Sequence, residues 1–262
     1  MRFVVQHITA VMLMCLVFSH SLPAKTPPLT FYTEHLPPYS YLEQGELKGI
    51  NVELVQQLCQ QLALECQFQL LPWARAFELA QRDVNSGVFS TARSPQREAL
   101  FQWVGPLASD WGYLFRLRSR PEVAPVDLEQ AKAFSIAVVR GDVYEQYFLR
   151  QGFKYRENLL DYSTRAESIP LFLQGRVDLI PASPLAISRW LAEYDAPPDV
   201  AEIVFKLRGV GDNYLALHPQ MRTELVAQLQ QALQQFVQSA DYQQLLQRYL
   251  SHQAAEALMD KP

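Results

Sequence analysis

The segment SPQREALF, residues 94–101, places an arginine where a helix start disfavours a cation. Ser94 followed by Pro95 is typical of an N-cap and a first helical position, so the pattern predicts a helix with Arg97 in its first turn. The amino end of a helix carries positive partial charge and exposed N–H groups, and it favours an anion such as Glu98. On these residues alone, the simplest expectation is a salt bridge from Arg97 to a carboxylate of the fold.

Motifs of several other chemistries are missing from the sequence. It contains no G-x-S-x-G nucleophile turn, no H-E-x-x-H zinc motif and no G-x-x-x-x-G-K phosphate loop. The GVGD run at residues 209–212 is too short for a dinucleotide fingerprint and is expected to mark a return through a hinge. His35, His218 and His252 are far apart in the chain. We therefore expect neither a metal site nor a cofactor.

The first 24 residues have the pattern of a secretory signal peptide. An apolar run from about Ile8 to Phe18 follows Arg2 and is too short to span a bilayer, although a membrane anchor is the alternative. Small and turn-forming residues then lead to a plausible cleavage site after Ala24. We expect residues 1–24 to be removed and the product to be periplasmic.

Composition narrows the classes of partner. The chain has 262 residues, is 49% hydrophobic and carries a formal net charge of −4. No basic patch is available to follow a phosphate backbone, so nucleic acid is not an expected partner. After the signal peptide no run is long enough to cross a membrane, and we expect a soluble monomer.

Two cysteines remain once the signal peptide is removed. Cys59 and Cys66 lie in the segment CQQLALEC. In an exported protein they are a candidate disulfide that closes a short loop between a helix and the next strand. The alternative is two buried thiols, because sequence alone does not show that the Cα atoms are close enough.

The elements that must position Arg97 alternate between strand and helix, which predicts an α/β fold with mostly parallel sheets. The first series has strands at 29–33, 66–72 and 85–90 and helices at 50–64 and 73–83. A second series has strands at 134–141 and 176–183 and helices at 142–152, 163–175 and 184–194; residues 112–130 join the two series. A last strand at 213–219 is followed by glutamine-rich helices at 224–238 and 241–251. The chain is therefore expected to form two similar lobes.

We expect lobe 1 to comprise residues 25–115 and 207–262, and lobe 2 to comprise residues 116–206. In open parallel sheets, ligands bind at the carboxyl ends of strands, beside the helix starts that follow. The sequence has three such junctions, FYTEHLPPY, VFSTARSPQR and VVRGDVYEQ. Two lobes with facing strand ends predict a cleft between them.

The order and spacing of four segments resemble one protein family. PPYSYLEQGELKGINVELVQQL, GVFSTARSPQRE with FQWVGPL, SIAVVRGDVYEQYF and LFLQGRVDLIPAS together are similar to the periplasmic solute-binding proteins of polar amino-acid ABC importers, over essentially the whole mature chain. The resemblance implies a two-lobed binding fold and an importer permease as partner. The spacing of Cys59 and Cys66 also resembles the disulfide of the lysine/arginine/ornithine- and histidine-binding members.

The resemblance also implies roles for residues at the cleft. An arginine at the position of Arg97 holds the ligand carboxylate in a bidentate pair, here with help from nearby N–H groups and from Ser90 and Thr91. In lobe 2, a turn matching Asp142, Val143 and Tyr144 offers backbone amides to the ligand carboxylate; Asp142 could instead be only an N-cap.

Aromatic residues are expected to wall the cleft. The loop after the first strand usually supplies a ring that stacks on the ligand, and Tyr39 or Tyr41 could do so, or either could belong to the core. Trp73 with Arg75 could form a second wall, because a ring beside a guanidinium suits stacking and carboxylate recognition. Trp73 could equally be core packing.

Two departures from the family pattern concern the ligand amine. Amino-acid binders place an aspartate, which holds the ligand ammonium, where this chain has Ser183, and the acid at the end of the first strand is replaced by Thr33 with Glu34 beside it. A buried ammonium without a counter-charge is costly. Either Glu34 takes over that role, or the ligand is not an ordinary α-amino acid.

Three functions fit these features. The first is a non-enzymatic binding protein that captures a small carboxylate-bearing solute for an ABC importer and closes by a hinge. The second is an enzyme resembling cyclohexadienyl dehydratases on the same scaffold, with Glu34 as the candidate acid. The third is a receptor that reports its ligand to a membrane sensor without transport.

Overall fold

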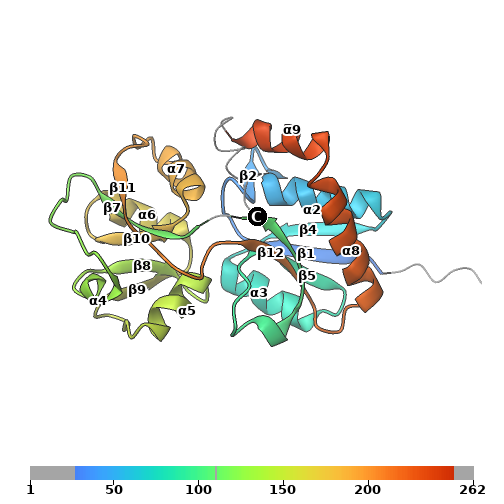
Figure 1. Ribbon diagram of the computed structural model, residues 1–262, viewed down its shortest axis with the longest axis horizontal. Helices are drawn as coiled ribbons and strands as arrows, with labels where there is room; N and C mark the ends of the chain where they lie inside the picture. The colour runs from blue at the N-terminus through green and yellow to red at the C-terminus, as the bar shows by residue number, and fades with distance from the viewer. Residues whose placement is uncertain (1–26, 110, 251–262) are drawn as a thin grey trace, which may run out of the picture.

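The computed structural model describes residues 27–109 and 111–250. The expected signal peptide, residues 1–24, lies outside these ranges. Within them, no helix combines the length and the apolar character that a membrane span requires. The fold is α/β and consists of two lobes, as expected (Figure 1).

Lobe 1 is built on a five-stranded sheet in the order β4–β1–β5–β12–β6. β1 is parallel to β4 and β5, whereas β12 is antiparallel to β5 and β6. Helices α2, α8 and α9 lie on one side of this sheet and α3 on the other (Figure 1). The elements are β1 (Leu29–Thr33), β2 (Tyr41–Glu43), β3 (Glu46–Lys48), α2 (Ile50–Gln61), β4 (Cys66–Leu70), α3 (Trp73–Arg82), β5 (Ser86–Thr91), the 3-10 helix η1 (Glu98–Leu100), β6 (Gln102–Ala108), β12 (Asn213–Leu217), α8 (Thr223–Phe236) and α9 (Ala240–Tyr249).

Lobe 2 is built on a second five-stranded sheet, in the order β11–β7–β10–β8–β9. β8 is parallel to β9 and β10, whereas β7 is antiparallel to β10 and β11. The elements are β7 (Tyr113–Leu117), α4 (Leu128–Ala131), β8 (Ile136–Val139), α5 (Val143–Arg150), β9 (Leu159–Tyr162), α6 (Arg165–Leu173), β10 (Leu179–Ala182), α7 (Pro184–Ala192) and β11 (Ala201–Lys206).

The chain crosses between the lobes twice. The first crossing lies between β6 and β7, so the expected boundary at residue 115 falls inside a strand that pairs with β10 and β11 of lobe 2. The second crossing runs from the end of β11 at Lys206 to β12 and contains residues 209–212, as expected of a return through a hinge.

Helix α2 shows how the sequence pattern produces the local structure. Ile50, Leu54 and Leu58 recur at helical spacing and are fully buried. The helix ends at Gln61, earlier than expected, and Ala63 then adopts a left-handed φ of 51° that turns the chain towards β4. A disulfide joins Cys59 near the end of α2 to Cys66 at the start of β4.

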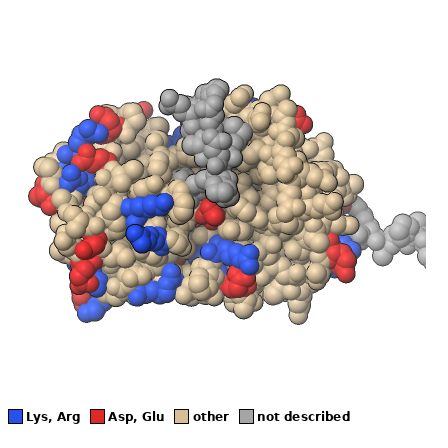
Figure 2. All heavy atoms as spheres, viewed as in Figure 1, with Lys and Arg blue, Asp and Glu red and all other residues tan. Residues whose placement is uncertain are grey.

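The charged surface differs between the lobes. On the face in Figure 2, basic and acidic side chains are interspersed over lobe 2, whereas lobe 1 presents mainly uncharged side chains. Interspersed charges of both signs are typical of a solvated surface and do not make a basic track for a phosphate backbone.

Candidate functional site

A cavity of about 60 Å³ lies between the lobes, where strand ends from both sheets face each other. Its walls come from the loop after β1, the carboxyl end of β5 and the starts of α3, α5, α6 and α7. It is the position that parallel sheets offer to a ligand. The lining residues are Glu34, Leu36, Tyr39, Trp73, Ser90, Thr91, Ala92, Arg97, Asp142, Val143, Tyr144, Arg165, Ala182, Ser183, Ala186, Trp190, Val210, Gly211 and Asn213.

The backbone around Arg97 differs from the expected helix start. A turn brings the Arg97 N–H to the Ser94 carbonyl oxygen at 2.9 Å, and the three-residue helix η1 begins only at Glu98. The hydroxyl of Ser94 does not cap this helix, and it is buried without a hydrogen-bond partner in the described part of the chain. The prediction of an α-helix with Ser94 as N-cap is wrong, because Phe101 is already extended and leads into β6.

The guanidinium of Arg97 is held by neutral groups. The side chain is only 1% exposed, and its guanidinium carbon lies against the neighbouring rings of Trp73 and Phe77, at 5.1 and 5.0 Å from their centroids. One terminal nitrogen donates to the Thr91 hydroxyl at 3.1 Å, and the other donates to the Gly141 carbonyl oxygen at 2.9 Å. Its Nε has no partner among the described residues.

Arg97 therefore carries a buried charge that the fold does not neutralise directly. No carboxylate of the described residues lies within ion-pair distance of it, so the salt bridge that the sequence alone favoured is not formed. Burial lowers the pKa of Arg97 to about 10, against the opposing influence of Asp142 and Glu34 further away. A buried, charged guanidinium with a free N–H is suited to an anion in the adjoining cavity.

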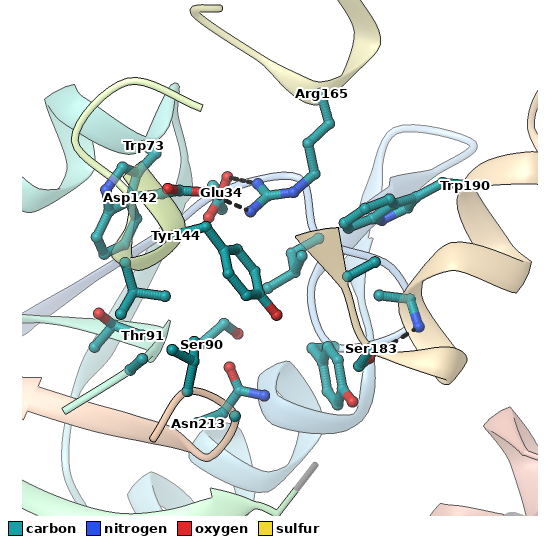
Figure 3. A pocket seen from close by; sticks show the side chains of 18 of the residues that line it. Glu34, Trp73, Ser90, Thr91, Asp142, Tyr144, Arg165, Ser183, Trp190 and Asn213 are labelled. Atoms are coloured by element: carbon teal, nitrogen blue, oxygen red, sulfur yellow. Dashed lines mark hydrogen bonds and ion pairs between the residues drawn. The ribbon is translucent and has the colours of Figure 1, made fainter. Parts of the chain in front are cut away.

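A second arginine, Arg165 at the start of α6, forms ion pairs with two acidic residues that line the cavity. It donates to Glu34 of lobe 1 at 2.5 Å and to Asp142 of lobe 2 at 3.4 Å, and its guanidinium lies 5.1 Å from the centroid of Trp190 (Figure 3). Burial disfavours its charge, but Glu34 and Asp142 outweigh that effect and raise the pKa of Arg165.

Asp142 has two roles in the structure. One carboxylate oxygen accepts a 2.7 Å hydrogen bond from the Glu145 N–H and so caps α5, and the other faces Arg165. Burial raises the pKa of Asp142 from 3.8 to about 6, against the lowering influences of Arg165 and the Glu145 N–H. The N-cap alternative is thus realised, and Asp142 also lines the cavity.

Neutral hydroxyl groups line part of the cavity in both lobes. Ser90 has a left-handed φ of 60°, and its hydroxyl accepts hydrogen bonds from Ser40 at 3.2 Å and from Asn51 at 3.1 Å. Thr33 joins the same network by donating to Ser40 at 2.9 Å. On the lobe 2 side, Ser183 caps α7 by accepting from the Ala186 N–H at 3.2 Å. These polar side chains therefore bring no charge to the cavity.

The structure brings together all but one of the expected site residues. The residues that line the cavity are Glu34, Tyr39, Trp73, Ser90, Thr91, Arg97, Asp142, Val143, Tyr144 and Ser183. Arg75 does not: it points to solvent and pairs with Glu78 at 2.9 Å one helical turn away. Tyr39, rather than Tyr41, is the lining tyrosine, and Trp73 is both 2% exposed and part of the wall.

Three prominent lining residues were missed by the sequence analysis: Arg165, Trp190 and Asn213. Arg165 carried the same signal as Arg97, a cation at a helix start, in the segment STRAES. Trp190 looked like an ordinary apolar position of α7, and Asn213 the first residue of a strand.

A second, larger cavity of about 220 Å³ adjoins the first. The two cavities share Glu34, Trp73 and Arg165, and Leu70, Leu71 and Pro72 make the lobe 1 wall of the second cavity apolar. His35 and residues 163–166, at and before the start of α6, complete its lining.

Sequence comparison identifies proteins similar to this chain. A model of the bacterial extracellular solute-binding proteins, family 3, matches residues 29–252. A relative of similar length, the arginine-binding periplasmic protein of Mannheimia haemolytica, is 21% identical over 241 residues, which cover 91% of this chain and 97% of the relative.

Solved structures share the fold. An ancestral arginine-binding protein bound to arginine has a TM-score of 0.76 at 15% identity. The matched region covers 87% of this chain and 100% of that protein's chain. A histidine kinase sensor domain with similarity to periplasmic binding proteins has a TM-score of 0.75 at 19% identity, covering 86% of this chain and 96% of its own. At such identities, the likeness establishes the fold and not the ligand.

Proposed function

Because this chain belongs to the bacterial extracellular solute-binding proteins of family 3, we propose that it captures a small carboxylate-bearing solute in the periplasm and delivers it to an ABC importer. The capture is non-enzymatic and uses closure of the two lobes. The observation that carries the proposal is Arg97: a buried guanidinium beside the cavity, with an unpartnered Nε and no carboxylate of the described residues in ion-pair distance.

A ligand carboxylate would supply what Arg97 lacks. A guanidinium and a carboxylate pair through two parallel hydrogen bonds, and such pairs are strongest where water is excluded. The Thr91 hydroxyl and the rings of Trp73 and Phe77 already fix the plane of the guanidinium. Pre-positioning of this kind lowers the entropic cost of binding.

Among the described residues that line the cavity, no acid is free to bind an ammonium group. Glu34 and Asp142 are both engaged by Arg165, and the Ser183 hydroxyl accepts from the Ala186 N–H. Of the two possibilities left open by the sequence, this arrangement favours a carboxylate without a free α-amine over a role for Glu34 as ammonium ligand. An amino acid would bury its ammonium unpaired, which is costly.

Contacts across the cavity support closure as the means of capture. Trp73 of lobe 1 donates to the Gly141 carbonyl oxygen of lobe 2 at 2.7 Å, and Glu34 of lobe 1 pairs with Arg165 of lobe 2. At the outer edge, His35 lies 3.0 Å from Glu193 across the same boundary. A ligand that touches both lobes stabilises the closed state by its differential affinity for it.

A thermal-shift screen tests this proposal. Small carboxylates without an amine are compared with the α-amino acids of the same carbon skeleton, since a ligand of the native state raises the melting temperature. We expect stabilisation by at least one amine-free acid and a smaller shift for its amino-acid counterpart. Larger shifts for the amino acids would contradict the preference, and no response to any carboxylate would contradict the carboxylate site.

A sensory role is the second candidate, supported by the similarity in fold to a histidine kinase sensor domain. Ligand capture would be the same, but the closed protein would signal to a membrane partner. Uptake of the labelled ligand by cells with and without the gene separates the two roles, because only transport requires the protein for uptake. The enzyme alternative has less support, since its candidate acid, Glu34, is held by Arg165 at 2.5 Å.

A further inference from the structure

The surroundings of Arg165 have the composition of a binding site for a guanidinium ion. The carboxylates of Glu34 and Asp142 face its terminal nitrogens at 2.5 and 3.4 Å, and its guanidinium carbon lies over the indole ring of Trp190, 5.1 Å from the centroid. Two acids and an aromatic face are the groups that recognise a planar cation. The side chain is only 11% exposed, so these contacts are shielded from water.

The parts of this site belong to different elements and to both lobes. Glu34 follows β1 of lobe 1, Asp142 caps α5, and Trp190 lies on α7 of lobe 2. All of them, with Arg165, line the cavity that also contains Arg97 (Figure 3). A guanidinium held here is therefore within the ligand cavity and not on the outer surface of the protein.

We propose that Glu34, Asp142 and Trp190 form a guanidinium-binding subsite that the chain fills with its own Arg165, and that Arg165 thereby excludes cationic ligands from the cavity. Arg165 is in this sense a residue that determines specificity. This inference rests on the proposed function and deepens it, because it names the class of solute that the same cavity rejects. The probe that tests it carries no carboxylate.

The alternative is a salt bridge that only fastens the lobes together. The two ideas differ in what happens when Arg165 is removed. Either way, removal of Arg165 leaves the carboxylates of Glu34 and Asp142 without their cation. A plain salt bridge then relaxes or is solvated and keeps no place for a probe, whereas a subsite keeps the two carboxylates and the indole ring positioned to bind a planar cation. The vacated space would then accept a free guanidinium group from solution.

The experiment uses the variant Arg165→Ala, with methylguanidine as the probe at low-millimolar concentration. We expect methylguanidine to raise the melting temperature of Arg165→Ala and to leave wild type unchanged. L-Arginine, which adds a carboxylate that Arg97 can hold, should bind Arg165→Ala at least tenfold tighter than wild type. The gain for methylguanidine should disappear in the double variant with Glu34→Gln.

Arg140→Ala is the matched control, because Arg140 is an exposed arginine of lobe 2 that pairs with Asp161 at 2.8 Å. Methylguanidine should not stabilise it. Equal responses of Arg165→Ala and Arg140→Ala would overturn the proposal. If Arg165→Ala does not fold, Arg165→Gln keeps most of the stem and vacates the place of the guanidinium; the absence of stabilisation by low-millimolar guanidinium ion would then overturn it.

These outcomes are separate from those of the proposed function. Methylguanidine has no carboxylate, so its binding does not depend on Arg97. A wild-type protein that binds no carboxylate would contradict the proposed function and leave this inference standing. A folded Arg165 variant that gains no affinity for guanidinium compounds would contradict this inference alone.

Discussion

The indole Nε1 of Trp73 donates a 2.7 Å hydrogen bond to the carbonyl oxygen of Gly141, and so joins the two lobes across the cavity. The same carbonyl oxygen accepts from Arg97 at 2.9 Å. Trp73 and Arg97 belong to lobe 1 and Gly141 belongs to lobe 2. Both hydrogen bonds therefore require the lobes to face each other closely, and they link Arg97, the proposed carboxylate-binding residue, to the position of lobe 2.

Removal of the Trp73 donor should weaken ligand binding. Trp73→Phe keeps an aromatic ring beside Arg97 but loses the hydrogen bond to Gly141, which destabilises the closed state. We expect a five- to tenfold loss of affinity, which corresponds to about 1 to 1.4 kcal/mol. Isothermal titration with the best carboxylate of the screen measures it.

Trp103→Phe is the control for that change. The Nε1 of Trp103 donates to the Glu98 carbonyl oxygen at 3.2 Å within lobe 1, so its loss should leave affinity unchanged. Equal losses in the two variants would mean that the Trp73 hydrogen bond has no special role in closure.

Asp142 should give the stability a distinctive pH dependence. Burial raises its pKa in the folded state from 3.8 to about 6, so the folded protein binds this proton more tightly than the unfolded chain does. Titration of Asp142 therefore contributes to the free energy of unfolding at pH 4, where the carboxyl is protonated in the folded state, and this contribution is lost as the pH rises through about 6. The variant Asp142→Asn keeps a side-chain oxygen that can accept the N-cap hydrogen bond, but it has no carboxyl group and so lacks the pH-dependent contribution to stability.

Urea unfolding of wild type and Asp142→Asn at several pH values tests that expectation. Relative to the variant, wild type should gain up to about 3 kcal/mol of unfolding free energy between pH 7 and pH 4. Comparison of the two proteins cancels the contributions of titrating groups that do not interact with Asp142. A difference that stays constant over this range would show that Asp142 is not destabilised by burial.

The disulfide between Cys59 and Cys66 should stabilise lobe 1. It closes a short loop with a sequence separation of 7, for which chain entropy predicts about 2.5 kcal/mol. The double variant Cys59→Ser with Cys66→Ser should lose this amount of unfolding free energy in denaturant titrations. Reductant should lower the stability of wild type and have no effect on the double variant; equal responses would argue against a disulfide in the purified protein.

Much of the fold could be predicted because its elements carry strong periodic patterns. The spacing of Ile50, Leu54 and Leu58 predicted α2, and the strand and helix alternation predicted two α/β lobes. Strands β9 and β11 were missed, because, apart from Leu159, their residues are only partly buried or exposed, so neither strand shows a clear alternation or an apolar run. The segment that was expected to connect the lobes contains β7, whose place depends on pairing with β10 and β11.

Part of the candidate site could be predicted from the sequence. Arg97 stood out as a cation at an expected helix start, but its role at the cleft was expected only from the family resemblance, because the residues alone favoured a salt bridge. The partners of Arg165 could not be found in this way, since Glu34 and Asp142 are 131 and 23 residues away from it along the chain. Only the folded chain brings those charges together across the lobe boundary.

The central claim is that Arg97 binds a carboxylate, and isothermal titration of Arg97→Ala tests it most directly. Arg93→Ala is the matched control, since Arg93 lies on the same segment, has 44% of its side chain exposed and pairs with Glu98. With the carboxylate that gives the largest thermal shift, Arg97→Ala should bind at least 100-fold more weakly than wild type, because a desolvated charge pair is worth about 3 kcal/mol or more. Arg93→Ala should bind as wild type does. Unchanged affinity in a folded Arg97→Ala protein would contradict the account.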